Sequence, residues 1–142
     1  MPDYDALNEM ATEFFINSKN HLFYEDHDQL MALLSHLEGD GATEYIRHHF
    51  DLQAIRDHYM AHWRLARIQL MVTELAEASE AVRKPGKMSN HVKVLTLFEE
   101  ELADTFIRVA DTAAAEGIDF GKAVRLKHEF NKTRPPKHKK LC

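Results

Sequence analysis

Two pairs of carboxylates, each pair three residues apart, are the feature that most restricts the fold of this chain. Glu74 and Glu77 form the first pair, and Glu101 and Asp104 form the second. At this spacing, in runs with helical periodicity, both acids of a pair project from one face of a helix. Like charges held close together repel one another and oppose folding unless a cation neutralises them. The sequence therefore predicts two facing helices with a divalent-cation site between them, and all-oxygen ligation favours Mg²⁺ or Mn²⁺ over Zn²⁺.

One such pair alone is most often solvated surface. The presence of two pairs, both bordering apolar stripes, favours a site instead. Steps of three and four residues separate the apolar side chains of each stripe, which is the pattern of a helix that faces a bundle. The first stripe consists of Ile68, Met71, Leu75, Ala78 and Val82, and the second of Val92, Leu95, Phe98, Leu102, Phe106 and Val109.

Length and composition predict one soluble domain. A chain of 142 residues can bury a core without disulfides, and the single cysteine, Cys142, can form no internal one. No apolar run reaches membrane-spanning length, and the first residues lack the order of a secretory signal, so we expect a cytoplasmic protein without a membrane partner. The net charge of -5 argues against binding to nucleic acid polymers.

Periodicity and stop signals predict an all-α bundle of four core helices with one or two extra helices. No convincing run of alternating polarity suggests a strand. The helix after residue 51 is long, so we expect a kink or break before Arg67, and we expect Ser89 or Asn90 to cap the helix that follows. The expected helices cover about 3–20, 28–38, 43–49, 51–84, 91–116 and 119–131.

A basic tail follows the last expected helix, because Pro135-Pro136 prevents further helix. The segment 132–142 carries most of its charge as lysine and arginine, on a chain that is acidic as a whole. Such a tail suits an anionic partner, for example a polyphosphate. A solvated terminus explains the composition equally well.

The motif order adds a family resemblance. Glu-x-x-Glu, a linker and Glu-x-x-Asp are followed by Gly-Ile-Asp-Phe at 117–120 and by Asn-Lys-Thr-Arg-Pro-Pro-Lys-His-Lys-Lys at 131–140. This order resembles the MazG-like all-α nucleoside triphosphate pyrophosphohydrolases, above all their small bacterial and phage members. The resemblance covers roughly 67–140, and more loosely 6–26. It implies a single MazG-like domain over 1–142, in which 28–59 is an inserted helical segment.

The resemblance implies Mg²⁺-dependent hydrolysis of a nucleoside or deoxynucleoside triphosphate between the α- and β-phosphates, with Mn²⁺ as a substitute. The products would be the monophosphate and pyrophosphate, in control of the nucleotide pool of a bacterial or phage-infected cell. By position, Glu74, Glu77, Glu101 and Asp104 would be the catalytic metal ligands. The base is left open among dUTP, dCTP, dGTP and modified nucleotides.

The group that activates water cannot be carried over from the family. Many relatives have Glu immediately before the first motif acid, where this chain has Thr73. Glu80 and Glu100 are further acids, but helical geometry turns each by about 100° or more from one motif partner.

Further candidate residues would contact the rest of a nucleotide. Lys84 and Arg108 each follow a motif acid by seven residues, and so lie near the same helix face, where they could bind phosphate, orient a ligand or serve as surface cations. Asn131, Arg134 and Lys137 belong to the tail motif, and the Pro-Pro turn fixes where the two cations emerge. Stacking and hydrogen-bonding groups for a base come from Phe14, Asn17, Phe23 and Tyr24, of which at least one Phe is expected in the core.

Several alternatives remain open. A phosphoribosyl-ATP pyrophosphohydrolase-like enzyme would share the metal and the cleaved bond, and a non-catalytic helical interaction module would use the acids only for solvation. A ferritin-like di-iron bundle is disfavoured because no Glu is followed by His at the third position. His58 and His62 have the spacing of helical zinc ligands but lack the metalloprotease Glu. We also expect a homodimer or homotetramer, since four core helices plus the amphipathic segment from Leu30 to Leu37 carry more apolar faces than one bundle buries.

Overall fold

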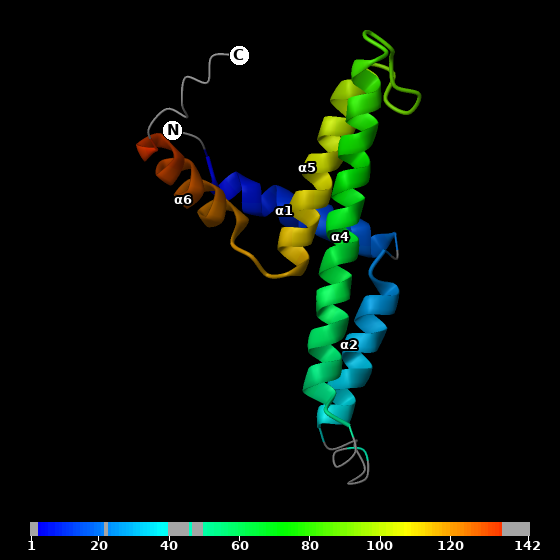
Figure 1. Cartoon of the computed structure of the whole chain (residues 1–142), viewed down its shortest axis with the longest axis vertical. Helices are drawn as coiled ribbons and strands as arrows, with labels where there is room; N and C mark the ends of the chain where they lie inside the picture. Colours follow the sequence, from blue (N-terminus) through cyan, green and yellow to red (C-terminus); the bar gives the residue numbers. More distant parts are fainter. Residues whose placement is uncertain (1–2, 22, 40–45, 47–49, 135–142) are drawn as a thin grey trace.

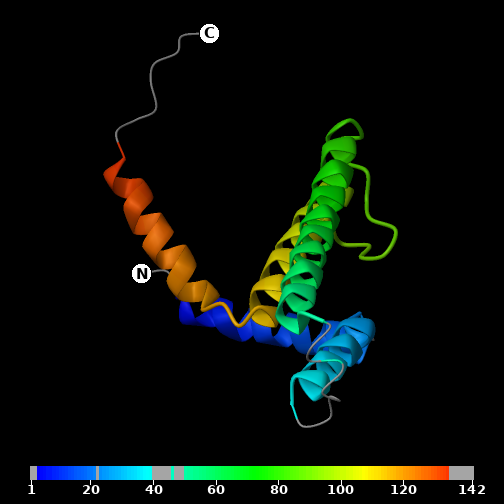
Figure 2. The same cartoon turned by 60° about the horizontal axis from the view of Figure 1, so that its bottom comes forward.

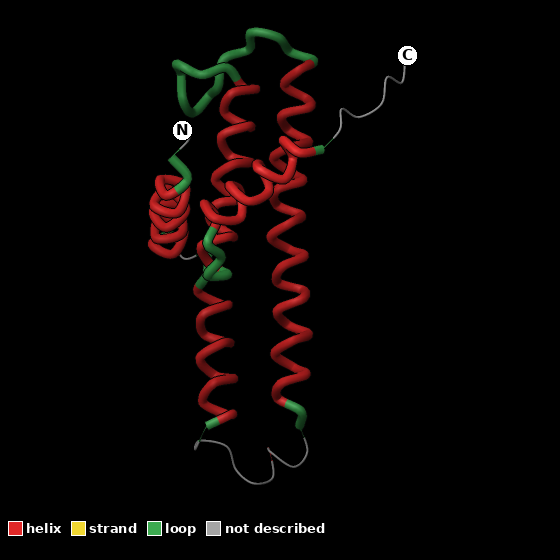
Figure 3. The backbone as a smooth tube through the Cα atoms, turned by 90° about the vertical axis from the view of Figure 1, so that its left-hand side faces the viewer, coloured by secondary structure: helices red, strands yellow, loops and turns green. Residues whose placement is uncertain are grey.

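The computed structural model describes residues 3–21, 23–39, 46 and 50–134. Within these ranges the regular structure is helical, and the one β-feature is an isolated bridge between Met88 and Thr96 (Figure 3). The all-α prediction is confirmed for this part of the chain. No helix within these ranges combines the length and the apolarity needed to cross a membrane. The helices are α1 (Asp5–Asn20), α2 (Glu25–Glu38), α4 (Leu52–Val82), α5 (Leu97–Ala115) and α6 (Phe120–Thr133).

An antiparallel pair of helices, α4 and α5, forms the axis of the molecule (Figure 1). α1 packs across α5, and α6 lies against α1 while extending away from the α4–α5 pair (Figure 2). α2 runs beside the first half of α4. The bundle-like packing is therefore centred on α1, α4 and α5, with α2 and α6 at its sides.

The expected kink or break in the long central helix is wrong, since α4 is one helix of 31 residues. The break was inferred from length alone, and the sequence between Leu52 and Val82 contains neither Gly nor Pro to cause one. The first half of α4 has a partner in α2: Arg56 donates to Glu38 on that helix. The boundary at residue 59 proposed for an inserted segment thus falls inside a continuous helix.

The expected start of the next helix is also wrong. α5 begins at Leu97, and its N-cap is Thr96, which forms a capping box with Glu99. Residues 83–96 form a loop instead, in which Ser89 Oγ accepts from the N–H groups of residues 91 and 92. The prediction started the helix too early because Val92 and Leu95, which precede the N-cap Thr96, have the apolar spacing of a helix.

The remaining boundaries agree more closely with the prediction. α1 begins two residues later than expected, at Asp5, and α2 begins three residues earlier, at Glu25. Asp119 caps α6 as predicted, by accepting from the N–H of Lys122, and Gly117 with φ 66° closes α5. The expected helix at 43–49 lies, except for residue 46, outside the described residues.

With the exception of Ala78, the side chains of the two apolar stripes are not buried in the single chain. Ile68 and Leu75 on α4 are 49% and 48% exposed, and Leu102 on α5 is 45% exposed. Periodicity shows that a helix has an apolar face but not what covers that face. The core instead is built largely from small side chains with one aromatic and one leucine: Ala11, Tyr24, Leu34, Ala78, Ala81, Ala110 and Ala113.

A buried ion pair joins α4 to α5 at the centre of the molecule. Arg67 donates to Asp111, and both side chains are almost fully buried. The Arg67 guanidinium also lies 4.8 Å from the ring centroid of Tyr24 and 5.9 Å from that of Trp63. This pair therefore ties three segments together: α4, α5 and the turn between α1 and α2.

We expect Arg67→Met to lower the free energy of unfolding by about 3–5 kcal/mol, because it leaves the Asp111 carboxylate buried without a counter-charge. Urea denaturation at fixed protein concentration measures the change. Arg64→Met is the matched control: Arg64 pairs with Glu116 between the same helices, but its side chain is 55% exposed, so about 0–1 kcal/mol should be lost. Equal losses in the two variants would contradict the central role of the buried pair.

Candidate metal centre

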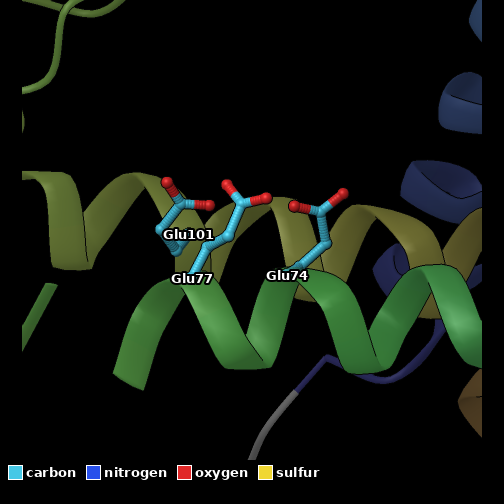
Figure 4. A group of neighbouring side chains, drawn as sticks. All are labelled: Glu74, Glu77 and Glu101. Carbon is cyan, nitrogen blue, oxygen red and sulfur yellow. The ribbon is translucent and has the colours of Figure 1, made fainter. Parts of the chain in front are cut away.

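Three carboxylates from the two central helices meet in one place. Glu74 and Glu77 on α4 and Glu101 on α5 each offer an oxygen, and these oxygens lie within 4.8 Å of one another. Figure 4 shows the three carboxylates projecting to the same side of the helix pair. The spacing of three residues on α4 thus brings its two acids beside an acid of the facing helix, as the sequence predicts for a cation site.

Buried small side chains lie next to the acids along α4. Ala78 and Ala81, buried on α4, follow the acids along the chain. Glu101 is only 7% exposed, and the side chain of Glu74 is 13% exposed. Carboxylates so withdrawn from water need a partner charge to offset the loss of hydration.

A cavity of about 270 Å³ lies at the acids, and Asp104 lines it with them. The structure therefore brings all four motif acids to one cavity. Glu100 also lines the cavity, although helical geometry alone predicts that it points away from one of the motif acids. The remaining lining residues are Asn90, His91 and Leu97.

Asn90 and His91 are site residues that sequence reasoning missed. Both were expected near a helix start, whereas they lie on the loop 83–96, which folds back over the acids. The backbone bond from Leu97 N to Lys87 O and the buried Ser89 hold this loop in place. The capping box at Thr96 is the signal that could have placed the loop correctly, because it marks the true start of α5.

Burial and the neighbouring acids raise the pKa values of two of the motif acids, Glu101 and Asp104. Burial raises the pKa of Glu101, and the nearby charges of Glu77, Asp104 and Glu74 add to the shift. Burial likewise raises the pKa of Asp104, and the charges of Glu74 and Glu100 act in the same direction. A divalent cation would remove this repulsion, and an all-carboxylate donor set suits a hard ion such as Mg²⁺ or Mn²⁺. The donor set therefore fits the predicted cofactor.

Arg108 is a cation that forms a hydrogen bond with one of these acids. Its Nε donates to Glu74 Oε1 at 3.1 Å, from α5 across to α4. Arg108 therefore contacts a motif acid directly, and its role in orienting a ligand residue stays a prediction. Lys84 lies past the end of α4 and lines a different hollow, with Pro85 and Phe98, so the structure does not bring it to the acids.

The tail residues lie on another part of the chain. Asn131 lines a hollow on α6 with Lys127 and His128, away from the acid cavity. Arg134 is the exposed C-cap of α6, which extends away from the central helices (Figure 2), and Lys137 lies outside the described residues. Within one chain, the structure brings none of the described tail residues to the acids.

The residues predicted to bind a base are also not part of the cavity lining. Tyr24 is buried, with Phe15 packed edge-on at 5.0 Å, and Phe14 packs edge-on against Phe106. Phe23 is exposed and stacks on His21. Asn17 is exposed on α1. Of this group, Phe23 and Asn17 remain accessible in the single chain.

The other residues weighed from the sequence have ordinary structural partners. Thr73 Oγ1 donates to the Gln69 carbonyl, and Glu80 pairs with Arg83 on the surface of α4. The rings of His58 and His62 lie 4.4 Å apart. In the described ranges, however, the glutamate triad is the one group of three or more side chains placed to hold a metal ion.

Comparison with models of known protein families, with curated protein sequences and with solved structures gave no match. The resemblance to the MazG-like enzymes consequently rests on the motifs quoted above.

The raised pKa of Glu101 predicts a pH-dependent effect of Glu101→Gln on the metal-free protein. A carboxyl group whose pKa is raised in the folded state stabilises the fold at pH values below its ordinary pKa of 4.5. This stabilisation is lost as the pH rises through the raised pKa. Glutamine resembles the protonated form, so the variant should be close to wild type at pH 4 and more stable at pH 7. Urea denaturation in EDTA measures this difference.

Glu99→Gln is the matched control, on the same turn of α5. Hydrogen bonds from Thr96 lower the pKa of Glu99, so this variant should be less stable than wild type at pH 7, and the difference should shrink as the pH falls. A difference between Glu101→Gln and wild type that stayed constant from pH 4 to pH 7 would contradict the repulsion among the acids.

Proposed function

We propose that this protein is a divalent-cation-dependent nucleoside triphosphate pyrophosphohydrolase of the MazG-like type. It hydrolyses a nucleoside or deoxynucleoside triphosphate to the monophosphate and pyrophosphate, in the cytoplasm, as part of nucleotide-pool control. The observation that carries the proposal is the meeting of Glu74, Glu77 and Glu101 within 4.8 Å at a cavity that Asp104 also lines. These are the four acids that the family motif singles out.

The acids have the placement that a triphosphate substrate needs. Glu74, Glu77, Glu101 and Asp104 would hold Mg²⁺, which neutralises charge on phosphate oxygens during cleavage of a phosphoanhydride. Without such an ion, the cavity would repel a triphosphate, because all four side chains are acidic. The cation and the anionic substrate are therefore expected to bind together.

The cavity also provides groups that can position a substrate or water. Asn90 and His91 offer neutral hydrogen-bonding groups on the loop side, and Glu100 offers a further carboxylate from α5. Glu100 is 9% exposed, and it is our candidate for the group that accepts a proton from water, a role that could not be carried over from the family. The base of the substrate is not specified by these residues.

We propose in addition that the active protein is a homodimer or homotetramer. Large apolar side chains on α4, α5 and α6 are too exposed for a chain of this size to remain alone in water. A second copy that packs against the outward faces of α4 and α5 would cover them. The side chains concerned are Leu65, Ile68, Val72, Leu75, Val82, Phe98, Leu102, Phe106, Leu126 and Phe130.

The activity is tested by incubating the protein with Mg²⁺ and a panel of nucleoside triphosphates, and by identifying the products. Monophosphate and pyrophosphate are expected; orthophosphate with a diphosphate would contradict the assigned bond. Glu74→Gln and Asp104→Asn should abolish turnover and keep the helical circular dichroism spectrum, since each removes a ligand charge. Glu80→Gln, on the surface of α4, is the control and should remain active.

The assembly is tested by sedimentation equilibrium at micromolar concentration. Wild type should have the mass of a dimer or tetramer, and Ile68→Asp combined with Leu75→Asp should give monomers, because two charges would then be buried without partners in the interface. Thr73→Asp adds one charge of the same sign about 140° around α4 from Ile68 and should leave the mass unchanged. A monomeric wild type would refute the proposed oligomer.

A further inference from the structure

Arg108 differs from the other arginines that pair with an acid on another helix. Its guanidinium donates to Glu74 through Nε alone. Arg56, Arg64 and Arg67 each donate to their acid through a terminal nitrogen. Among the residues that the structure describes, neither terminal nitrogen of Arg108 has a hydrogen-bond partner. Most of the donors of this guanidinium are therefore still available.

The location of Arg108 makes those donors useful. Its side chain is 31% exposed, between the more buried Glu74 and the solvent. It follows Asp104 by one helical turn on α5, so it stands beside two of the four acids. A planar guanidinium with two unpaired terminal nitrogens matches the oxygens of a phosphate group.

We propose that Arg108 joins the cation site to an anion site: its Nε holds the Glu74 carboxylate, and its terminal nitrogens bind a phosphate group of a polyphosphate ligand beside the cation. This inference rests on the proposed function and deepens it. It assigns to Arg108 both of the roles that the sequence left as alternatives, orienting a metal ligand and contacting phosphate.

One carboxylate can serve both partners. A carboxylate has two oxygens with about four acceptor positions, so Glu74 can accept from Arg108 and still present an oxygen to a cation. The pairing also restricts the rotation of the Glu74 side chain, as hydrogen-bonded neighbours of metal ligands commonly do. Arg108 is thus a positioning residue for the cation and a direct contact for the anion.

The test separates these two parts by measuring binding instead of turnover. Mn²⁺ is titrated into the intact chain and followed by electron paramagnetic resonance, and Mg²⁺-saturated tripolyphosphate is titrated by calorimetry. The proteins are wild type, Arg108→Gln, Arg108→Lys and, as a control, Arg64→Gln, whose arginine pairs with Glu116 between the same two helices away from the acid cavity. Circular dichroism checks the fold of each, and the lysine variant retains the positive charge.

We expect Arg108→Gln to bind Mn²⁺ within about threefold of wild type, because loss of the bond that orients Glu74 is offset by removal of a positive charge beside the cation. Tripolyphosphate should bind at least tenfold more weakly, which corresponds to the loss of one charge-assisted contact. Arg108→Lys should be intermediate for tripolyphosphate, and Arg64→Gln should match wild type in both titrations. Unchanged tripolyphosphate binding in Arg108→Gln would overturn the inference. Equal losses of affinity for Mn²⁺ and for tripolyphosphate would also overturn it, because they indicate that Arg108 only positions Glu74. A wild-type protein that binds no Mn²⁺ would overturn the proposed function itself.

Discussion

The charged side chains that lie between α4 and α5, here called the charged seam, are the constraint on which the rest of the structure depends. At one level the seam carries Arg67 and Asp111, a buried pair whose charges cancel. Toward the C-terminal end of α4 it carries Glu74 and Glu101, with Arg108 as the one cation bonded to the motif acids in the described chain. One end of the seam is thus neutral and the other is strongly acidic, and the acidic end is where the proposed cation would bind.

A polar seam also decides where the apolar side chains lie. Because acids and alanines occupy the contact between α4 and α5, the larger apolar residues are turned to the outside of the pair, where α1 covers only some of them. Phe106 illustrates this: its ring meets Phe14 of α1, yet the residue is still 36% exposed. The cluster of acids and the uncovered apolar faces are therefore two consequences of one arrangement.

The acid pairs and the all-α fold could be predicted because both depend on local spacing, which a helix converts directly into geometry. The loop 83–96 could not, because Val92 and Leu95 continue the helical pattern, whereas hydrogen bonds of Ser89 to residues 91, 92 and 95, which periodicity does not reveal, fix the loop. The pair Arg67–Asp111 joins residues 44 positions apart and leaves no periodic signal in the sequence. Side chains that meet across helices could be predicted for the paired motif acids, because each pair shares a helix face, but not for single residues such as Arg67 and Asp111.

The position of α6 links the function to the assembly. The basic tail follows α6, and α6 leads away from the acid cavity of its own chain (Figure 2). In the proposed enzyme, phosphate contacts from Arg134 would belong to the cavity of a second copy, whereas Arg108 would contact phosphate at the cavity of its own chain. A nucleotide bound in this way would hold two chains together. Binding of the proposed cation, binding of the substrate and packing of the apolar faces would therefore stabilise one another. The acids between α4 and α5 would gain a cation, and the outward apolar faces of the two helices would gain a second copy of the chain.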